Sequence, residues 1–168
     1  MKEQYPNQEI NQEENDDLMQ IVGFVIGNEL FGVDILMVQE IIRETSCTAI
    51  PNAPDFIEGV INLRGNIVPV VDLRRRLNLN SMKASGKTWV MILNIGDRIT
   101  GFVVDAVTKV LKVPRNGIKP PPDIVVSGMQ SKYITGVCQI DQGLLILLDF
   151  NRILLVEEIM KLRELSAN

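Results

Sequence analysis

The sequence predicts a mainly β protein built from two small barrels of short strands. Apolar runs broken by glycine turns occur at four places along the chain and indicate β-hairpins. These hairpins match one another in pairs at nearly constant spacing, which indicates an internal repeat. A packed interior is expected, because 46% of the 168 residues are hydrophobic, although only 5% are aromatic. The length suits one domain, or two small domains that share a core.

Each expected hairpin turns at a glycine with polar neighbours, as a tight turn requires where φ is positive. The hairpins and their turns are Ile21–Ile35 with Gly27–Glu29, Val60–Val71 with Arg64–Asn66, Trp89–Val104 with Gly96–Arg98, and Ile134–Leu148 with Asp141–Gly143. The second hairpin lies within the stretch 59–73, where two apolar strands hold Arg64 at their tip. Its counterpart at 136–150 has Asp141 in place of Arg64.

The repeat is visible as two sets of residue pairs with fixed spacing. Pairs 77 residues apart are Ile57/Ile134, Val60/Val137, Asp72/Asp149 and Leu77/Leu154, and pairs 69 residues apart are Gly27/Gly96, Gly32/Gly101, Val38/Val107 and Pro51/Pro120. We expect two barrel subdomains at about 19–82 and 87–157, each too small to be stable without its twin. The sequence leaves open whether each repeat closes its own barrel or exchanges a strand with the other.

Few helices are expected. The segment 35–43 predicts a short helix after the first hairpin, although it is rich in β-branched residues. The segment 72–78 predicts one or two helical turns capped by Asp72. The segment 151–165 has apolar residues at helical spacing and predicts a C-terminal helix, whose apolar stripe is either core or a partner site.

Charge is concentrated at the N-terminus. Residues 1–17 contain six acidic residues and one lysine and predict a disordered acidic tail. The remaining chain, residues 18–168, is nearly neutral, which argues against nucleic-acid binding. The run Arg74–Arg76 is interpreted as a solvated helix turn rather than a phosphate site. No apolar run is long enough to cross a membrane. With no signal-peptide pattern and two distant cysteines, a cytoplasmic location is expected.

The sequence offers little for catalysis. It contains no histidine, which removes Ser-His-Asp and Cys-His catalysis and histidine-ligated metals. Neither standard phosphate-binding glycine motif is present. Asp72 and Asp149 each follow a strand and precede a helical pattern, so we interpret both as helix N-caps. We expect no catalytic residue, metal or cofactor.

Some residues are candidates for binding. Arg64 on a rigid hairpin could present its donors to a partner, or it could be a solvated turn residue. Glu40 could pair with Arg64 or meet the same partner. Gly59 and Val107 would allow close approach by a partner helix, although sheet geometry also explains such residues. The prolines at 120–122 suit a stiff connector or a docking edge.

Four segments resemble the CheW family of bacterial chemotaxis coupling proteins. They are FGVDILMVQEI at 31–41, IPNAPDFIEGVINLRGNIVPVVDLRRRL at 50–77, GFVVDAVTKVL at 101–111 and YITGV at 133–137. The segments occur in the family's order, and the resemblance covers about residues 19–160. It implies two packed five-stranded SH3-like β-barrels around a shared apolar core.

The resemblance also implies a non-enzymatic adaptor. It would couple the cytoplasmic signalling tip of transmembrane chemoreceptors to the regulatory domain of the histidine kinase CheA. The receptor-facing set implied by the family consists of Val38, Glu40, Gly59, Arg64 and Val107. The kinase-facing edge would include Lys119 and Ile124, where arginine and phenylalanine also occur in the family.

Two other functions stay open at this point. The chain could be an adaptor in another receptor–kinase pathway, such as one controlling pili or gliding. It could also be a small-ligand sensor that uses the groove between the barrels, with a carboxylate pair as polar anchors.

Overall fold

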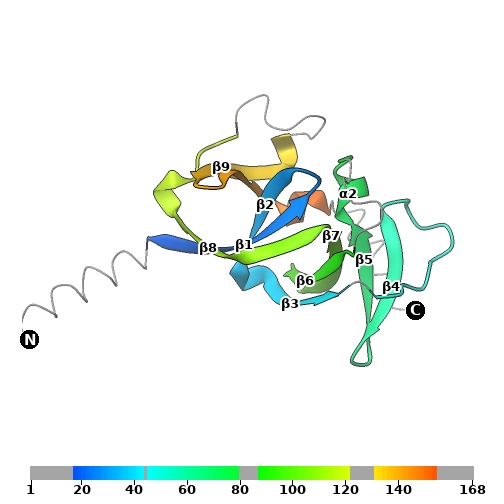
Figure 1. Cartoon of the computed structure of the whole chain (residues 1–168). Coiled ribbons are helices and arrows are strands. Elements are labelled where there is room, and N and C mark those ends of the chain that lie inside the picture. Colours follow the sequence, from blue (N-terminus) through cyan, green and yellow to red (C-terminus); the bar gives the residue numbers. More distant parts are fainter. Residues whose placement is uncertain (1–16, 44, 80–86, 122–130, 155–168) are drawn as a thin grey trace, which may run out of the picture.

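The computed structural model describes residues 17–43, 45–79, 87–121 and 131–154, and in them the predicted mainly β fold is confirmed. Ten strands in this part of the chain form two five-stranded sheets (Figure 1). Each sheet combines three antiparallel pairings with one parallel pairing, between β2 and β10 in one sheet and between β5 and β7 in the other. The two sheets therefore share one plan.

We call the sheets A and B. In spatial order, sheet A contains β8 (Ala106–Pro114), β1 (Leu18–Ile26), β2 (Glu29–Asp34), β10 (Gly143–Leu148) and β9 (Ile134–Ile140). Sheet B contains β3 (Val38–Arg43), β6 (Trp89–Ile95), β7 (Arg98–Val104), β5 (Asn66–Asp72) and β4 (Ile57–Leu63). The four predicted hairpins are β1–β2, β4–β5, β6–β7 and β9–β10.

The two repeats exchange strands. Sheet A takes β1 and β2 from the first repeat and β8, β9 and β10 from the second, whereas sheet B takes β6 and β7 from the second repeat and β3, β4 and β5 from the first. The chain therefore crosses between the sheets after β2 and again after β7. Because of this exchange, the two halves cannot separate without breaking both sheets.

In the described residues the sheets are barrel-like but are not closed by a continuous ladder. Lys119, which follows β8, exchanges two backbone hydrogen bonds of 2.8 Å with Val137 on β9. Thr48, which follows β3, exchanges two of 2.9 Å with Val60 on β4. A single bridge thus joins the two edges of each sheet, at equivalent places in the two repeats.

The helical predictions were only partly right. A helix over 35–43 was wrong, because only η1 (Ile35–Met37) is a 3₁₀ turn and residues 38–43 form strand β3. The β-branched side chains in that segment favour the strand. The turn α2 (Leu73–Arg76) forms as predicted, with the Asp72 side chain accepting a hydrogen bond from the backbone N–H of Arg74.

The other short helical elements lie in the second repeat. They are η2 (Arg115–Gly117), η3 (Ser131–Tyr133) and α3 (Phe150–Ile153). The predicted C-terminal helix over 151–165 overlaps α3, and from residue 155 onward it lies outside the described residues, as does nearly all of the predicted acidic tail. Asp149 caps α3 by accepting a hydrogen bond from the backbone N–H of Arg152, so both predicted N-caps are confirmed.

The main core lies between the sheets. Phe24 and Phe31 of sheet A stack with ring centroids 5.8 Å apart, and Phe150 of α3 contacts both Phe24 and Phe102 of sheet B. The centroids of Phe102 and Phe150 are 5.0 Å apart in an edge-to-face arrangement. Smaller apolar clusters pack on the other face of each sheet. A shared aromatic core of this kind holds the two exchanged halves in one body.

Candidate functional site

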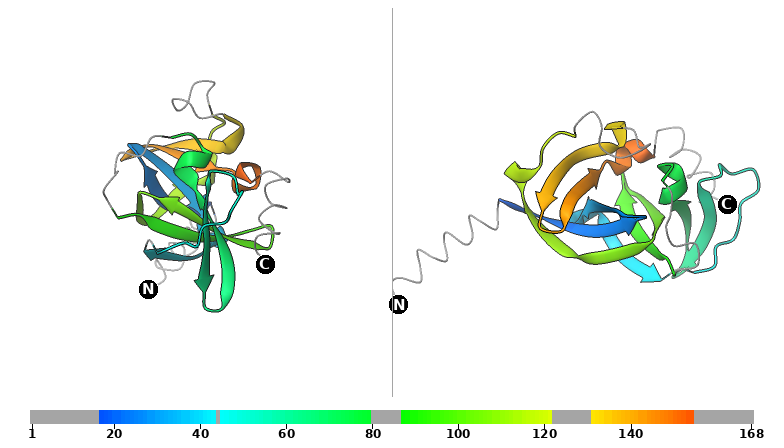
Figure 2. Two further views of the ribbon diagram at one scale, coloured as in Figure 1. Left: turned by 90° about the vertical axis from the view of Figure 1, so that its right-hand side faces the viewer. Right: turned by 45° about the horizontal axis from the view of Figure 1, so that its top comes forward.

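Arg64 lies at the tip of the β4–β5 hairpin, which projects from the body of the protein (Figures 1 and 2). Its Nη2 donates a hydrogen bond of 2.8 Å to Oε2 of Glu40 on β3. The Arg64 side chain is 72% exposed, whereas that of Glu40 is 26% exposed. The hydrogen bond and charge of Glu40 raise the pKa of the Arg64 guanidinium. The pair therefore holds a permanent cation on the outside of sheet B.

The turn itself fixes the direction of Arg64. Arg64 and Gly65 both have left-handed backbones, with φ of 51° and 89°, as a two-residue type I′ turn requires. The backbone N–H of Gly65 donates a 2.8 Å hydrogen bond to Oδ1 of Asn62, which ties the turn to its own strand. The strands that carry the turn pack into an apolar cluster through buried residues such as Ile61 and Val68. Little conformational freedom is left for Arg64 to lose on binding.

A cavity of about 270 Å³ lies beside the tip. Its polar lining is Gln39, Arg64, Asn66, Asp97 and Arg98, and its apolar lining is Leu63, Ile67, Val68 and Ile99. The apolar Ile67 is 42% exposed there. The site predicted around Arg64 is therefore a concave surface with cationic and apolar parts, rather than an isolated charge.

The other members of the predicted receptor-facing set occupy different settings. Val38 on β3 and Val107 on β8 are both half-buried and pack against the core between the sheets. Gly59 is buried on β4, with a φ of 149°, and a Cβ there would lie 2.3 Å from the carbonyl oxygen of Thr48. On that side Gly59 allows the Thr48 backbone to approach and offers no open surface.

The predicted kinase-facing residues are only partly described. Lys119 is exposed and its backbone forms the bridge to Val137 on β9. Ile124 lies outside the described residues. The structure thus places Lys119 at the seam of sheet A, whereas Arg64 and Glu40 belong to sheet B.

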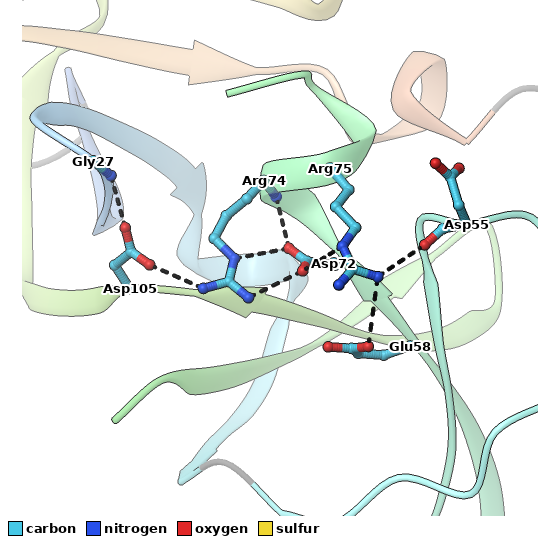
Figure 3. A network of polar contacts seen from close by, with 7 residues as sticks. All are labelled: Gly27, Asp55, Glu58, Asp72, Arg74, Arg75 and Asp105. Atoms are coloured by element: carbon cyan, nitrogen blue, oxygen red, sulfur yellow. Dashed lines mark hydrogen bonds and ion pairs between the residues drawn. The ribbon is translucent and has the colours of Figure 1, made fainter. Parts of the chain in front are cut away.

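A buried polar network lies where the two sheets meet (Figure 3). The Arg74 guanidinium donates from Nε and Nη2 to the two carboxylate oxygens of Asp72, at 2.9 and 3.0 Å, and Nη1 reaches Asp105 at 3.3 Å. Asp105 also accepts a 2.7 Å hydrogen bond from the backbone N–H of Gly27. The bonds to Asp72 raise the pKa of Arg74, although burial opposes them. The network joins the end of β5 to the turn of sheet A.

The interpretation of Arg74–Arg76 as a solvated turn was therefore wrong for two of the three residues. The Arg74 side chain is only 18% exposed. Arg76 lies over the rings of Phe56 and Tyr133, 5.3 and 5.1 Å from their centroids, and donates to the carbonyl oxygen of Ile153. Only Arg75 is largely exposed, at 57%. Two arginines thus connect the halves, because their partners are far away in the sequence.

An apolar surface was missed by sequence reasoning. Leu36 in η1 is 88% exposed, an unusual degree for a leucine. A mainly apolar cavity of about 290 Å³ lies in sheet A next to η1, lined in part by Met19, Met37 and Phe150. The repeat carried a signal, because Leu36 is 69 residues before the acidic Asp105. A mismatch of apolar and charged residues at equivalent places can mark a surface with a separate role.

Within the described residues, no group of three His, Cys, Asp or Glu side chains is arranged to hold a metal ion. In the same part of the chain, no helix is long and apolar enough to cross a membrane. Of the two cysteines, Cys138 is buried, and burial raises the pKa of its thiol. The described residues thus present one rigid charged tip and one apolar surface.

Comparisons with known proteins confirm the family resemblance found in the sequence. Residues 20–158 match the family model of the CheW-like domain. The chain is 43% identical over 135 residues to the chemotaxis protein CheW of Klebsiella aerogenes, covering 80% of this chain and 81% of that protein. It is 35% identical over 155 residues to the chemotaxis protein CheW of Treponema pallidum, covering 90% and 91%. The crystal structure of the scaffolding protein TtCheW from Thermoanaerobacter tengcongensis aligns with a TM-score of 0.76 and 34% identity, covering 83% of this chain and 90% of that chain.

Proposed function

The chain belongs to the CheW family of chemotaxis coupling proteins, and from this premise we propose which partners it joins and through which surfaces. It holds the cytoplasmic signalling tip of a chemoreceptor and the regulatory domain of a CheA-type histidine kinase in one assembly. The observation that carries this proposal is the family match over residues 20–158. The assembly acts in the cytoplasm, at membrane-associated receptor arrays.

The chemistry of the chain supports action through contacts rather than catalysis. A phosphoryl group cannot pass through this protein on histidine, because the sequence has none. A scaffold needs at least two separate docking surfaces, and two separate cavities in the described residues are candidates for them. The Arg64 cavity is lined by β3, β4, β5 and β7 and by two turns, whereas the cavity near Leu36 is lined by sheet A together with η1 and α3.

We assign the receptor to the surface that includes Val38, Glu40, Arg64 and Val107, with Gly59 shaping the strand behind it. Arg64 and Glu40 are already paired, so the receptor meets a preformed charged contact. Val38 and Val107 supply half-buried apolar positions against which a helix can lie, in the manner of helix-in-groove recognition. The kinase domain is assigned to the edge marked by Lys119 and Ile124.

The test is assembly from purified parts. A receptor signalling-tip fragment and a kinase regulatory domain are mixed with the full chain and followed by size-exclusion chromatography. We expect a ternary complex that does not form when this chain is left out. If neither partner binds at micromolar concentration while a metabolite raises the melting temperature, the chain is a ligand sensor and not a coupling protein.

The apolar surface can be tested in the same assay. Leu36→Ser removes an exposed side chain, so folding should be unaffected while one of the two binary complexes weakens. Leu144→Ser is the matched control, since Leu144 is 39% exposed on β10 of the same sheet. If both partners bind the Leu36→Ser variant as tightly as the wild type, this surface is not a docking surface.

A further inference from the structure

A second arginine lies beside Arg64 and has no assigned role. Arg98, the first residue of β7, lines the same cavity as Arg64 and is half-buried. Among the residues that the structure describes, no hydrogen bond or ion pair satisfies its guanidinium. A half-buried guanidinium without a partner retains its full capacity to bind an anion.

The sheet brings the two arginines to one edge. Strands β5 and β7 are parallel neighbours, and their register pairs Val70 with Gly101. The same offset, continued toward the start of both strands, sets Ile67 level with Arg98. The turn that precedes β5 carries Arg64, and the turn that precedes β7 is Gly96–Asp97, which has positive φ at both residues. Two rigid turns therefore frame the cavity.

Arg64 keeps donors free for a ligand. Among the described residues, only its Nη2 is engaged, by one hydrogen bond to Glu40. A guanidinium has five N–H groups, so Nε–H, both N–H groups of Nη1 and the second N–H of Nη2 remain available. Glu40 holds this fork in position while Arg98 approaches the same cavity from β7. The arrangement suits a carboxylate, which can accept from one or both arginines.

The other half of the chain provides an internal comparison. By the repeat spacing, Arg64 corresponds to Asp141 and Arg98 corresponds to Glu29. Both cations at the tip of sheet B are thus replaced by acids at the equivalent tip of sheet A. The backbone is shared, and the charge is reversed. The cationic pair is therefore a property of one tip and not of the fold.

We propose that the cavity between Arg64 and Arg98 binds the carboxylate of an acidic side chain on the receptor's signalling tip. The proposal rests on the proposed function, which brings the receptor to this end of sheet B. The exposed Ile67 forms an apolar wall next to the arginines, so the acidic residue is expected to have an apolar neighbour on the same receptor helix. Asp97 also lines the cavity, so its charged lining is two arginines and one aspartate, a net charge of +1 that suits one carboxylate.

The experiment is a calorimetric titration of the full chain with a receptor signalling-tip fragment at low and high salt. Arg98→Gln should raise the Kd about tenfold at low salt, because it removes a charged hydrogen-bonding partner. When salt is added, the Arg98→Gln variant should also lose less affinity than the wild type does. Arg98→Lys should lie between the two, since it keeps the charge and loses the planar fork.

Glu29→Gln is the matched control, because it changes the equivalent position at the other tip. It should leave the Kd within about twofold of the wild type, as expected for a half-buried charge at the tip of the other sheet. Thermal melts test whether each variant is folded. If Arg98→Gln is unfolded, the Kd of Arg98→Lys tests the proposal instead.

Replacing single acids of the receptor fragment by their amides then identifies the ligand. One of these amide substitutions should raise the Kd for the wild type but not for the Arg98→Gln variant, as expected when two residues interact directly. The proposal is overturned if the wild type binds the fragment and the Arg98 variants bind it equally well. It is also overturned if these variants weaken only the binding of the kinase domain. If the wild type itself does not bind, the proposed function has failed, and this inference fails with it.

Discussion

The first and second halves of the chain form equivalent strands, yet among the described residues only the first has an ion-pair network with buried carboxylates at the junction that follows its last strand. At the end of β5, Arg74 closes a buried network with Asp72 and Asp105. At the equivalent end of β10, the repeat has Asn151 and Leu36 in place of Arg74 and Asp105. One junction is therefore locked by buried ions, while the other leaves a cavity and an exposed leucine.

The comparison indicates that residues shared by the two halves build the scaffold, whereas residues that differ are candidates for separate roles. Asp72 and Asp149 are the common part, since each caps the helical turn that follows it. Arg75 and Arg152 even lie at the same distance from those caps, 3.6 Å from Nε to Oδ2. Residues that match across the halves thus explain the fold, and residues that differ are the ones to change experimentally.

The largest effect is expected at the buried network. Arg74→Ala removes the guanidinium that bridges two carboxylates, each 2% exposed, and should lower the free energy of unfolding by about 3 kcal/mol. Asn151→Ala changes the equivalent position and should cost less than about 0.5 kcal/mol. Urea unfolding followed by the fluorescence of Trp89, the only tryptophan, measures both. Equal losses in the two variants would show that the network does not distinguish the halves.

A smaller difference is expected at the strand bridges. Gly59→Ala must accommodate both a φ of 149° and a Cβ at 2.3 Å from the Thr48 carbonyl oxygen, and should cost about 2 kcal/mol. The equivalent Gly136→Ala meets the Ile118 methyl group at 2.6 Å and the Lys119 carbonyl oxygen at 3.0 Å, with no left-handed backbone. It should cost about 1 kcal/mol, because a side chain can move aside more easily than a backbone. Thermal unfolding under identical conditions ranks the two, and the reverse order would contradict the structure.

Much of this fold could be predicted from local pattern. The turns at Arg64–Gly65 and Gly96–Asp97 followed from glycine beside polar residues, and the cap at Asp72 followed from a strand that ends before a helical pattern. These features depend on neighbours in the sequence. The pairing of Arg64 with Glu40 was one of two alternatives from the sequence, and the structure shows the pair.

The remaining features of the fold and the site depend on contacts between distant residues, which a local sequence pattern does not show. Three consecutive arginines indicate a solvated surface, yet Arg74 is half-buried because Asp105 reaches it from the second repeat after the strand exchange. The segment 38–43 became a strand because an edge of sheet B was available to pair with it. Arg98 was not singled out, since its setting beside Arg64 arises only from the parallel register of β5 and β7.

A gain in stability is expected at Thr100 on β7. Thr100 is 1% exposed, and its hydroxyl has no hydrogen-bond partner among the described residues. The equivalent residue of the other half is Phe31, which packs in the core without a polar group. Thr100→Val keeps the shape and removes the unpaired hydroxyl, so it should raise the free energy of unfolding by about 1 kcal/mol. A loss of stability in urea unfolding would mean that an internal water satisfies the hydroxyl.

The smallest change in stability is expected at the two hairpin tips, although there the change in function is expected to be decisive. Arg64→Ala and Asp141→Ala each remove a charge from a turn, and both melting curves should overlay that of the wild type, because exposed charges contribute little to folding. Only Arg64→Ala should abolish receptor-dependent control of the kinase in the assembled system. Its ion pair with Glu40 then serves to position the guanidinium for a partner rather than to hold the fold. Unfolding of Arg64→Ala at a clearly lower temperature would show instead that the pair is structural, and the asymmetry of the tips would lose its functional meaning.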